Sequence, residues 1–443
     1  MTTIPQVSQA LHTVLTTATT QAAHDLHYTK RPDRATFCPS TLVQTLVLGW
    51  LAHPSATLER LSQMAARVGA AVSPQAIDQR FTFDTAALLR AVLTATLHHV
   101  IAADPVALPL LQRFTGVWVH DGTTIALPDA LADSWRGCGG STAVGTPAAL
   151  KCGVQWDILT GALTALDLAA GRTHDSALPC QQRPLPIGSL RLADLGFFNL
   201  QRLAELDHQG VYWLTKIRPT VCVRTPDQQR QPLSTFVVQQ ASHGYDGWVH
   251  IGRDHPIQAR ILVQPVPQEV ADQRRRRIRQ AAQDKGTLPS AAALTLAAWT
   301  ILITNVSSSR LSRSEALGIM KVRWQIELLF KLWKSHGQLA TWRTAKPARI
   351  LCEIYAKLIA MVLQHWILVV GCWAYPDRSF VKAAQVVRDH ATDLACAQAD
   401  PARFTAVLTT IQHVLVRTAR MNPRRTQPNT YQHLGTLTTD AEA

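Results

Sequence analysis

The sequence is organised around the stretch Met320-Lys-Val-Arg-Trp-Gln-Ile-Glu-Leu-Leu-Phe-Lys-Leu-Trp-Lys334. It contains no Gly or Pro and consists mostly of good helix formers, so it predicts one helix. At about 100° per residue, Glu327 and Lys334 lie within about 40° of Arg323 around the axis. These three residues would form one polar line about three turns long. A second interpretation is an Arg–Glu pair on an ordinary solvated face.

The apolar residues of this helix support the first interpretation. One face groups Ile319, Val322, Ile326, Leu329, Phe330 and Trp333, and a further side is formed by Leu328 and Leu332. A helix that is apolar on two sides is held between layers of structure. The polar line is therefore expected to face a polar cleft.

Composition indicates a basic globular protein that binds a polyanion. The chain has 443 residues, which favours two or three domains. Lys and Arg exceed Asp and Glu by 44 − 30 = 14, which suggests nucleic acid rather than a membrane as partner. The eight cysteines form no C-x-x-C pair. Neither a zinc site nor a disulfide framework is expected, and a cytoplasmic setting is the simplest.

Two segments bear on whether the chain carries a membrane or export signal. Residues 1–30 are polar and lack the apolar run of a signal peptide. The segment Tyr355–Tyr375 is apolar but is interrupted by Lys357, Gln364 and His365. The uninterrupted part is too short to span a bilayer, so a buried helix is expected.

Residues 1–35 are predicted to be a flexible arm or a marginal helix, and residues 36–105 a helical, helix-turn-helix-like DNA-binding region. The expected helices run from Ser40, as N-cap, to about His53, then over Leu58–Gly69, Gln75–Phe83 and Ala86–Ala103. Ser73 and Pro74 open the third helix, which carries Gln79 and Arg80 as candidate DNA-binding residues. An ordinary helical hairpin remains the alternative.

The following residues predict an α/β core in two parts, 106–217 and 299–350, separated by a β-rich insertion at 218–298. The expected strands and helix of the first part are Val117–Asp121 with Thr123–Leu127, Lys151–Ile158, Ala162–Leu168, Leu190–Asp194, Asn199–His208 and Val211–Ile217. The insertion is expected to hold short strands at Thr220–Arg224, Gly247–Gly252 and Gln258–Gln264, and a helix at Glu269–Gln283. The strand Trp299–Thr304 starts the second part. A helical region (351–420) and a flexible tail (421–443) complete the chain.

Three carboxylates stand where this order of elements can bring them together. Asp121 and Asp194 end core strands, and Glu327 lies on the later helix. Carboxylate oxygens suit Mg²⁺ or Mn²⁺, and two such ions could promote an in-line phosphoryl displacement. Arg323 and Lys334 would hold phosphates beside them. Each Asp alone is a weak signal, because Asp commonly follows a strand by starting a turn.

Several motifs resemble one family, the insertion-sequence-4 family of bacterial DDE transposases. The spacing Arg323-x₃-Glu327-x₆-Lys334 resembles its Tyr-x₂-Arg-x₃-Glu-x₆-Lys signature. The stretches Val119-His-Asp121-Gly-Thr and Ala193-Asp194-Leu-Gly-Phe-Phe resemble its first and second Asp motifs, and Lys151–Asp157 and Gly171–Asp175 its intervening hairpin. One position departs from the signature, because Met320 stands where the family has Tyr. Met cannot donate a hydrogen bond to phosphate.

The resemblance implies an RNase H-like fold and a homodimer that cleaves and transfers double-stranded DNA at element ends in the bacterial cytoplasm, on the nucleoid. It implies Asp121, Asp194 and Glu327 as catalytic metal ligands, and Arg323 and Lys334 as DNA-binding residues. Family members that cut through a DNA hairpin have a Trp that stacks on a flipped base, at the position of Trp299. A core Trp is the alternative there. The rival functions are a DNA-binding repressor derived from a transposase and a metal nuclease without strand transfer.

Other residues carry weaker expectations. Asp157 and Asp175 are expected to be turn or supporting residues rather than ligands. His120 is expected in the core or on the outer face of its strand, since adjacent strand residues point to opposite faces. The run Arg274-Arg-Arg-Arg277 with Arg279 is either a solvated helix face or a contact with the DNA backbone.

Overall fold

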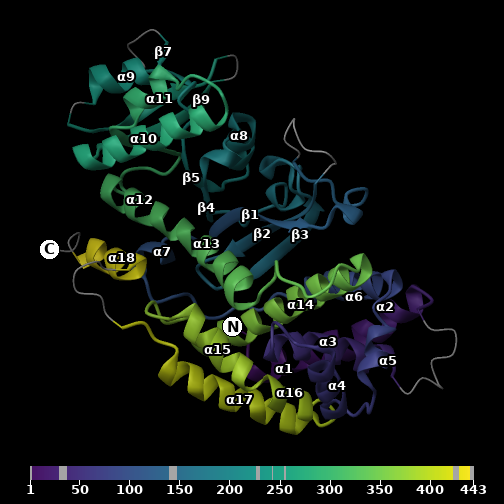
Figure 1. The fold of residues 1–443 in the computed structure, drawn as a ribbon. Helices are drawn as coiled ribbons and strands as arrows, with labels where there is room; N and C mark the ends of the chain where they lie inside the picture. The colour runs from purple at the N-terminus through teal and green to yellow at the C-terminus, as the bar shows by residue number, and fades with distance from the viewer. Residues whose placement is uncertain are drawn as a thin grey trace. The chain divides into compact units, whose positions relative to one another are not determined.

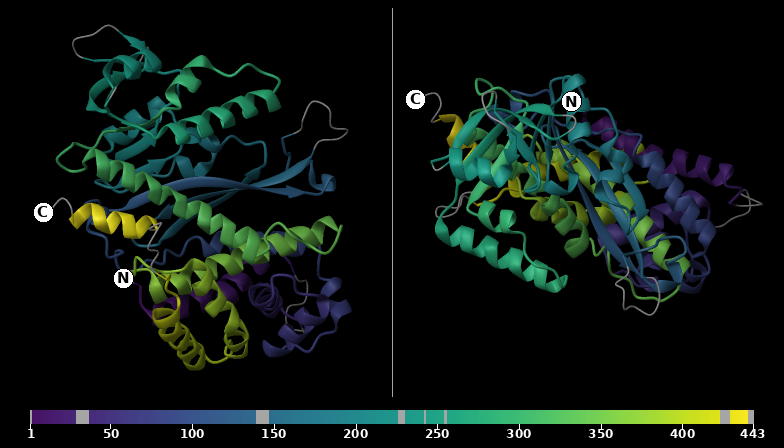
Figure 2. Two further views of the ribbon diagram at one scale, coloured as in Figure 1. Left: turned by 60° about the vertical axis from the view of Figure 1, so that its left-hand side comes forward. Right: turned by 90° about the horizontal axis from the view of Figure 1, so that it is seen from above.

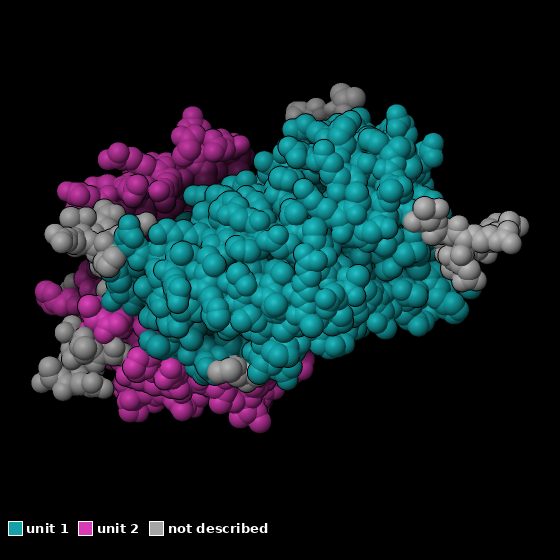
Figure 3. All heavy atoms as spheres, turned by 90° about the horizontal axis from the view of Figure 1, so that it is seen from below, with its two compact units in different colours: residues 1–107, 120–182, 324–432 teal, residues 108–119, 183–323, 433–443 magenta. Residues whose placement is uncertain are grey.

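The computed structural model describes residues 2–28, 37–138, 147–225, 230–241, 243–253, 256–422 and 429–439. The chain divides into two compact units, which are coloured separately in Figure 3. Unit 1 comprises residues 1–107, 120–182 and 324–432, and unit 2 comprises residues 108–119, 183–323 and 433–443. Each unit is described by itself.

Unit 1 is built around helix α14 (Pro347–Cys372), which is buried along almost its whole length. The helices packed on it include α3 (Pro39–Ala52), α6 (Phe83–Thr96), α15 (Phe380–Asp389) and α17 (Pro401–Thr418). Figures 1 and 2 show α14 among these helices. Helix α14 is long and apolar enough to cross a membrane, but 94% of its most apolar window is buried in the protein. This confirms the buried helix expected around Tyr355–Tyr375.

The prediction of a flexible arm at residues 1–35 is wrong for residues 4–25, where the helical alternative is correct; residues 29–36 lie outside the described residues. Residues 4–25 form α1 (Ile4–Thr13), a π-helical segment (Val14–Ala18) and α2 (Thr19–Asp25). Thr3 and Gln6 make a reciprocal capping box that starts α1. The side chains of Val7, Leu11 and Val14 are buried. Their helical spacing, diluted by Thr and Gln in the sequence, supplies the apolar face that orders the segment.

The helices of residues 36–105 exist as predicted, with corrected ends. Cys38 rather than Ser40 is the N-cap of α3, with Pro39 in the first turn. Helix α4 spans Leu58–Arg67 and is followed by Gly69 at φ +89°. Ser73 caps α5, as predicted, but α5 ends at Asp78 instead of Phe83. Helix α6 then begins at Phe83, and it ends at Thr96 rather than at Ala103.

A physical reason for the short α5 is that Thr82 starts the next helix. The Thr82 hydroxyl accepts the backbone N–H of Thr85 as an N-cap. Asp78, at the end of α5, is paired with Lys346 and Arg349 at 3.0 and 3.1 Å. The second helix of the expected helix-turn-helix therefore has only five residues, Pro74–Asp78.

The strands of unit 1 include a long hairpin. Strands β2 (Ala148–Asp157) and β3 (Leu163–Ala170) pair antiparallel, and β2 lies beside β1 (Val117–Leu127), whose residues 120–127 belong to this unit. The Asp157 carboxylate accepts the N–H groups of Leu159 and Thr160, so Asp157 is a turn residue, as expected. Asp175 supports the hairpin through an ion pair with Lys151 at 2.8 Å.

Unit 2 contains a mixed sheet in the order β1-β4-β5-β10-β9-β8-β6-β7. Residues 117–119 of β1 pair in parallel with β4 (Leu190–Ala193), and β4 pairs in parallel with β5 (Tyr212–Lys216). Strand β10 (Trp299–Thr304) is antiparallel to β5 and β9 (Ile257–Pro265). Strands β8 (Tyr245–Ile251), β6 (Cys222–Arg224) and β7 (Gln231–Pro232) complete the sheet. Helix α8 (Leu200–His208) begins after Asn199, its N-cap.

Residues 218–298 are less purely β than predicted. They hold β6 to β9 and also three helices, α9 (Leu233–Gln240), α10 (Gln268–Asp284) and α11 (Ala291–Leu296). The apolar inner face of β8, β9 and β10 contributes Val249, Ile251, Ala259, Ile261 and Ile303 to one buried cluster. Helix α9 is short and Gln-rich, and helix α11 is short and Ala-rich. Because of this, apolar residues do not recur clearly at helical spacing in either sequence. Their apolar sides cover this same cluster with Phe236, Val237 and Leu296.

The prediction of one regular helix over Met320–Lys334 is wrong. Helix α12 (Arg313–Met320) is followed by a 3₁₀ turn (Lys321–Arg323), α13 (Trp324–Lys331) and a π-helical segment (Leu332–His336). No Gly or Pro lies inside to cause these changes, so tertiary packing imposes them. All six residues of the predicted apolar face are buried. The constant angle of about 100° per residue does not hold through these segments.

The tail is also more ordered than predicted. Residues 423–428 and 440–443 lie outside the described residues, but α18 spans Thr430–Thr439. The Tyr431 hydroxyl accepts a hydrogen bond from Arg378 at 2.8 Å, and both residues are buried. The flexible-tail prediction is therefore wrong for this helix, because a buried aromatic ring near the end of the chain anchors it.

Candidate active site

Asp194 lies at the end of a buried parallel strand, as the sequence predicts. Leu190 and Leu192 in β4 pair with Val117 and Val119 of β1, and Ala193 pairs with Thr215 of β5. Asp194 then leaves the sheet as the N-cap of a 3₁₀ turn, Leu195–Phe197. Apolar residues pack the strand while the carboxylate comes after its last residue, where it stays one-third exposed.

Two cations hold the Asp194 carboxylate. Lys216 lies 2.9 Å from Oδ1, and an Arg323 guanidinium nitrogen lies 3.8 Å from Oδ2. Burial by itself would raise the pKa of Asp194. The hydrogen bonds from Lys216 and from the Leu195 N–H, with the charges of Lys216 and Arg323, lower that pKa below its ordinary value. The site therefore keeps an ionised carboxylate among positive charges.

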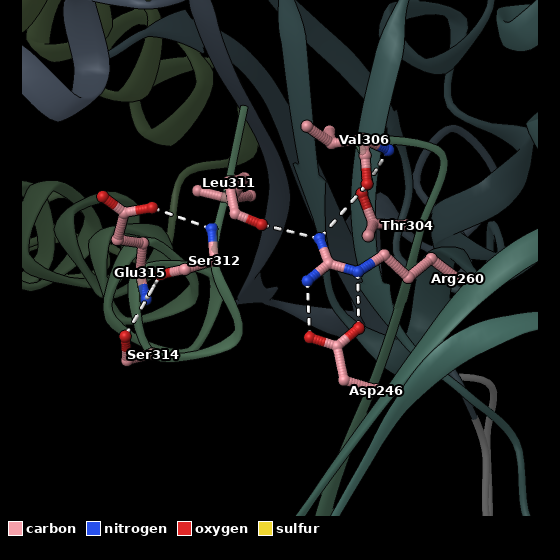
Figure 4. Close-up of polar contacts among 8 residues, drawn as sticks. All are labelled: Asp246, Arg260, Thr304, Val306, Leu311, Ser312, Ser314 and Glu315. Atoms are coloured by element: carbon pink, nitrogen blue, oxygen red, sulfur yellow. Dashed lines mark hydrogen bonds and ion pairs between the residues drawn. The ribbon is translucent and has the colours of Figure 1, made fainter. Parts of the chain in front are cut away.

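The segment that leads to Arg323 is fixed at its start by a buried arginine (Figure 4). Arg260 of β9 is 1% exposed and forms a two-pronged ion pair with Asp246 of β8, with both contacts at 2.6 Å. Its remaining guanidinium nitrogen donates to the carbonyl oxygens of Leu311 at 2.6 Å and Val306 at 3.3 Å. One side chain thus ties two strands of residues 218–298 to the loop before α12.

Helix α12 begins directly after that loop with a capping box. The Ser312 hydroxyl accepts the Glu315 N–H, and the Glu315 carboxylate accepts the Ser312 N–H at 2.8 Å. Arg113 pairs with the other oxygen of Glu315 at 2.9 Å. Burial would raise the pKa of Glu315, but the Arg113 and Ser312 hydrogen bonds lower it. The start of α12 is therefore held by its own capping box and by the ion pair with Arg113.

Unit 1 carries the other predicted site residues. Asp121 lies in β1, and one of its carboxylate oxygens accepts the Gly122 N–H at 2.8 Å. Lys334, in the π-helical segment, donates to the Thr124 carbonyl oxygen of the same strand at 2.8 Å. Glu327 lies in α13 and is partly exposed. Within this unit the signature segment is thus tied to β1 three residues beyond Asp121.

The structure brings some of the predicted residues together directly. Asp194 meets Arg323 in unit 2, and Lys334 meets the Asp121 strand in unit 1. Among the described residues, no group of three or more His, Cys, Asp or Glu side chains is close enough to hold a metal ion. The donor chemistry nevertheless fits a divalent cation, because Asp194 supplies carboxylate oxygens and stays one-third exposed.

Sequence reasoning missed Lys216. It is the last residue of β5, the strand that pairs with β4, and Leu302 lies opposite it in β10. The sequence did contain a signal for Lys216. This residue lies near the end of a predicted strand, and that strand is the next one after the strand that ends in Asp194. Parallel neighbours place their carboxyl ends at the same edge of a sheet.

The remaining candidate residues occupy the following positions in the fold. Gln79 and Arg80 are exposed in the turn after α5. Trp299 is the first residue of β10, and its ring is partly buried against the hydrophobic cluster of unit 2. His120 is 1% exposed, as expected for a core residue.

A strand-end carboxylate kept ionised among cations fits the class of enzymes that act on phosphate esters. The comparisons with known proteins identify the family within that class. The family described as "Transposase DDE domain" matches residues 112–363, more than half of the chain. The chain belongs to this family: it is a DDE transposase, an enzyme that cleaves DNA. The mixed α/β architecture fits the RNase H-like fold of such domains, which use divalent metal ions.

Relatives cover most of the chain at low identity. The transposase for insertion sequence element IS231E of Bacillus thuringiensis subsp. finitimus is 24% identical over 410 residues, 86% of this chain and 85% of that protein. The transposase for IS231F of Bacillus thuringiensis subsp. israelensis is 24% identical over 94% of this chain and 92% of its own length. The transposase for IS1151 of Clostridium perfringens is 24% identical over 70% of each chain.

Proposed function

We propose that the protein is the transposase of an insertion sequence of the insertion-sequence-4 type. It binds the ends of its element as a homodimer on double-stranded DNA, in the cytoplasm and on the nucleoid. There it cleaves the ends and transfers them to target DNA. The spacing of Arg323, Glu327 and Lys334 supports this assignment, as do the insertion-sequence relatives.

Asp121, Asp194 and Glu327 are the proposed ligands of Mg²⁺, with Mn²⁺ as a substitute. The observation that carries this proposal is the Asp194 carboxylate, which is held ionised at the end of β4. The stretches Val119-His-Asp121-Gly-Thr and Ala193-Asp194-Leu-Gly-Phe-Phe, which resemble the two Asp motifs of the family, support including Asp121. Metal ions held by these three carboxylates would supply activation of the attacking oxygen and stabilisation of the leaving one.

The chain's cations would hold the DNA. Lys216 and Arg323 balance the Asp194 charge in the free protein, and both exchange this carboxylate for backbone phosphate when DNA binds. Lys334 holds a phosphate beside β1. Gln79 and Arg80, exposed after α5, contact the element ends. Met320 supplies no phosphate contact, so Met320→Tyr is expected to tighten binding to the ends.

Cleavage through a DNA hairpin is part of the proposal, with Trp299 stacking on the extruded base. Its partly exposed ring supports this role, and stacking would recover about 1–3 kcal/mol. Trp299→Ala should preserve first-strand nicking while hairpin product falls on end-labelled DNA. If the wild-type protein forms no DNA hairpin product, the stacking role is excluded and Trp299 is a structural residue only.

Cleavage of DNA from the element ends tests the ligand assignment. Asp121→Asn, Asp194→Asn and Glu327→Gln should each abolish Mg²⁺-dependent cleavage while retaining binding, since each keeps its shape and loses ligand charge. Asp175→Asn is the matched control, because Asp175 pairs with Lys151; it should cleave. Cleavage by any of the three variants at the wild-type rate would remove that residue from the site.

A further inference from the structure

Helix α10 (Gln268–Asp284) carries five arginines, of which two contact the protein and three are exposed. Arg274 donates to the Trp299 carbonyl oxygen at 2.8 Å and to the Thr300 hydroxyl at 3.1 Å, and burial lowers its pKa. Arg275 reaches Asp272 at 2.8 Å and the Leu294 carbonyl oxygen at 3.4 Å. These two side chains attach the helix to β10 and α11. They account for only part of the charge.

The other three arginines, Arg276, Arg277 and Arg279, point outward. All three are exposed, and within the described part of the chain their side chains make no hydrogen bond or ion pair. At about 100° per residue they cover about 160° of the helix circumference, on the side away from buried Ala271 and Ala282. Helix α10 lies beside α11, as Figure 1 shows.

The acidic residues of α10 do not neutralise this face. Asp272 accepts hydrogen bonds from Gln268 and from inward-facing Arg275. Asp284 accepts one from Gln280 at 2.8 Å. Glu269 lies in the first turn, where the helix dipole stabilises it. Among the residues that the structure describes, these three positive charges therefore have no counter-charge, and Arg276 and Arg279 repel each other as i,i+3 neighbours.

The helix itself gains little from this arrangement. Its fully buried side chains are two alanines, so little apolar area holds it in place. Replacing the outward arginines by neutral helix formers would remove repulsion at no cost in packing. A partner that supplies negative charge accounts for three exposed guanidinium groups better than stability does.

We propose that Arg276, Arg277 and Arg279 of α10 bind the phosphate backbone of duplex DNA. The guanidinium group matches phosphate in a two-pronged geometry, and a duplex presents phosphates continuously. This inference rests on the proposed function, which places double-stranded DNA on the protein. The contact is independent of base sequence, so it serves element ends and target DNA alike.

The test is the salt dependence of DNA binding, measured by fluorescence anisotropy over a KCl series. The probes are a duplex carrying the element end and a duplex of unrelated sequence. The variant R276Q/R277Q/R279Q should lower the slope of log affinity against log salt by up to about 3, at roughly 0.9 per phosphate contact. Affinity at low salt should fall about tenfold or more for both duplexes. The Arg→Lys triple variant should keep most of the slope, since Lys retains the charge.

Two controls separate this contact from other effects. The variant Q273A/Q283A changes exposed neutral residues of the same helix and should bind as wild type does. The thermal unfolding midpoint of R276Q/R277Q/R279Q should match that of wild type. An unchanged slope in that folded variant, or a loss confined to one duplex, would overturn the inference and leave the proposed function intact. Wild-type protein that binds neither duplex would instead overturn the proposed function.

Discussion

Arg260 and the outward arginines of α10 lie in the same unit and in opposite environments. Arg260 is buried, and its guanidinium is fully occupied by Asp246 and by two carbonyl oxygens. Arg276 and Arg277 are exposed and unpaired within the described residues. The first arginine acts on the protein's own chain, at the start of α12. The others are available to a partner.

The difference shows that a basic composition does not by itself locate a DNA-binding surface. The net charge of +14 counts both kinds of arginine equally. A buried arginine holds neighbouring carbonyl and carboxylate groups whose desolvation would otherwise be unfavourable. An exposed, unpaired arginine contributes little to stability and retains its attraction for phosphate. Stability and DNA affinity should therefore respond to different substitutions.

Arg260→Met should give the largest loss of stability, about 3–5 kcal/mol, because it leaves Asp246 and two carbonyl groups without their buried partner. Urea unfolding monitored by tryptophan fluorescence measures it. Asp246→Asn should cost less and, combined with Arg260→Met, add little. A fully additive double variant would contradict the pairing.

Glu315→Gln should destabilise by about 1–3 kcal/mol at neutral pH, through loss of charge opposite Arg113. The pKa of Glu315 is lowered in the folded protein, so its stabilisation is present above its ordinary pKa of 4.5 and is lost as pH falls through the lower folded pKa. The difference between wild type and variant in unfolding free energy should shrink below pH 4.5. A difference that stays constant with pH would exclude an ionised Glu315 as the cause.

Arg274→Met and Arg277→Met form a matched pair on one helix. Arg274→Met loses two hydrogen bonds to β10 and should cost about 1–3 kcal/mol. Arg277→Met should change stability by no more than about 0.5 kcal/mol. Thermal unfolding of the two variants side by side gives the comparison. Equal effects would mean that exposure does not separate the two kinds of arginine.

Met320→Tyr should have the smallest effect on stability, because Met320 is only partly buried at the end of α12. Its expected effect is tighter binding to element ends, through one added hydroxyl donor. Fluorescence anisotropy with end DNA measures this change. Weaker binding with a lowered unfolding midpoint would show that the surroundings have adapted to Met.

Local signals predicted one strand end of the site and missed the other. The apolar run before Asp194 is a buried strand that ends at Ala193, as predicted, whereas β1 does not end at Asp121 but continues to Leu127. Tertiary packing decided the rest. The 3₁₀ and π-helical segments around α13 have no sequence cause such as Pro, and α18 is ordered by a distant contact between Tyr431 and Arg378. Lys216 reaches Asp194 only through strand pairing.

Manganese binding, followed by the electron paramagnetic resonance of Mn²⁺ in the presence of end DNA, tests the central claim most directly. Wild-type protein and Asp175→Asn should bind Mn²⁺ with the same affinity. Asp121→Asn, Asp194→Asn and Glu327→Gln should each weaken binding about tenfold or more, because each removes a charged ligand. Wild-type affinity in Asp194→Asn would contradict the assignment of this carboxylate as a metal ligand.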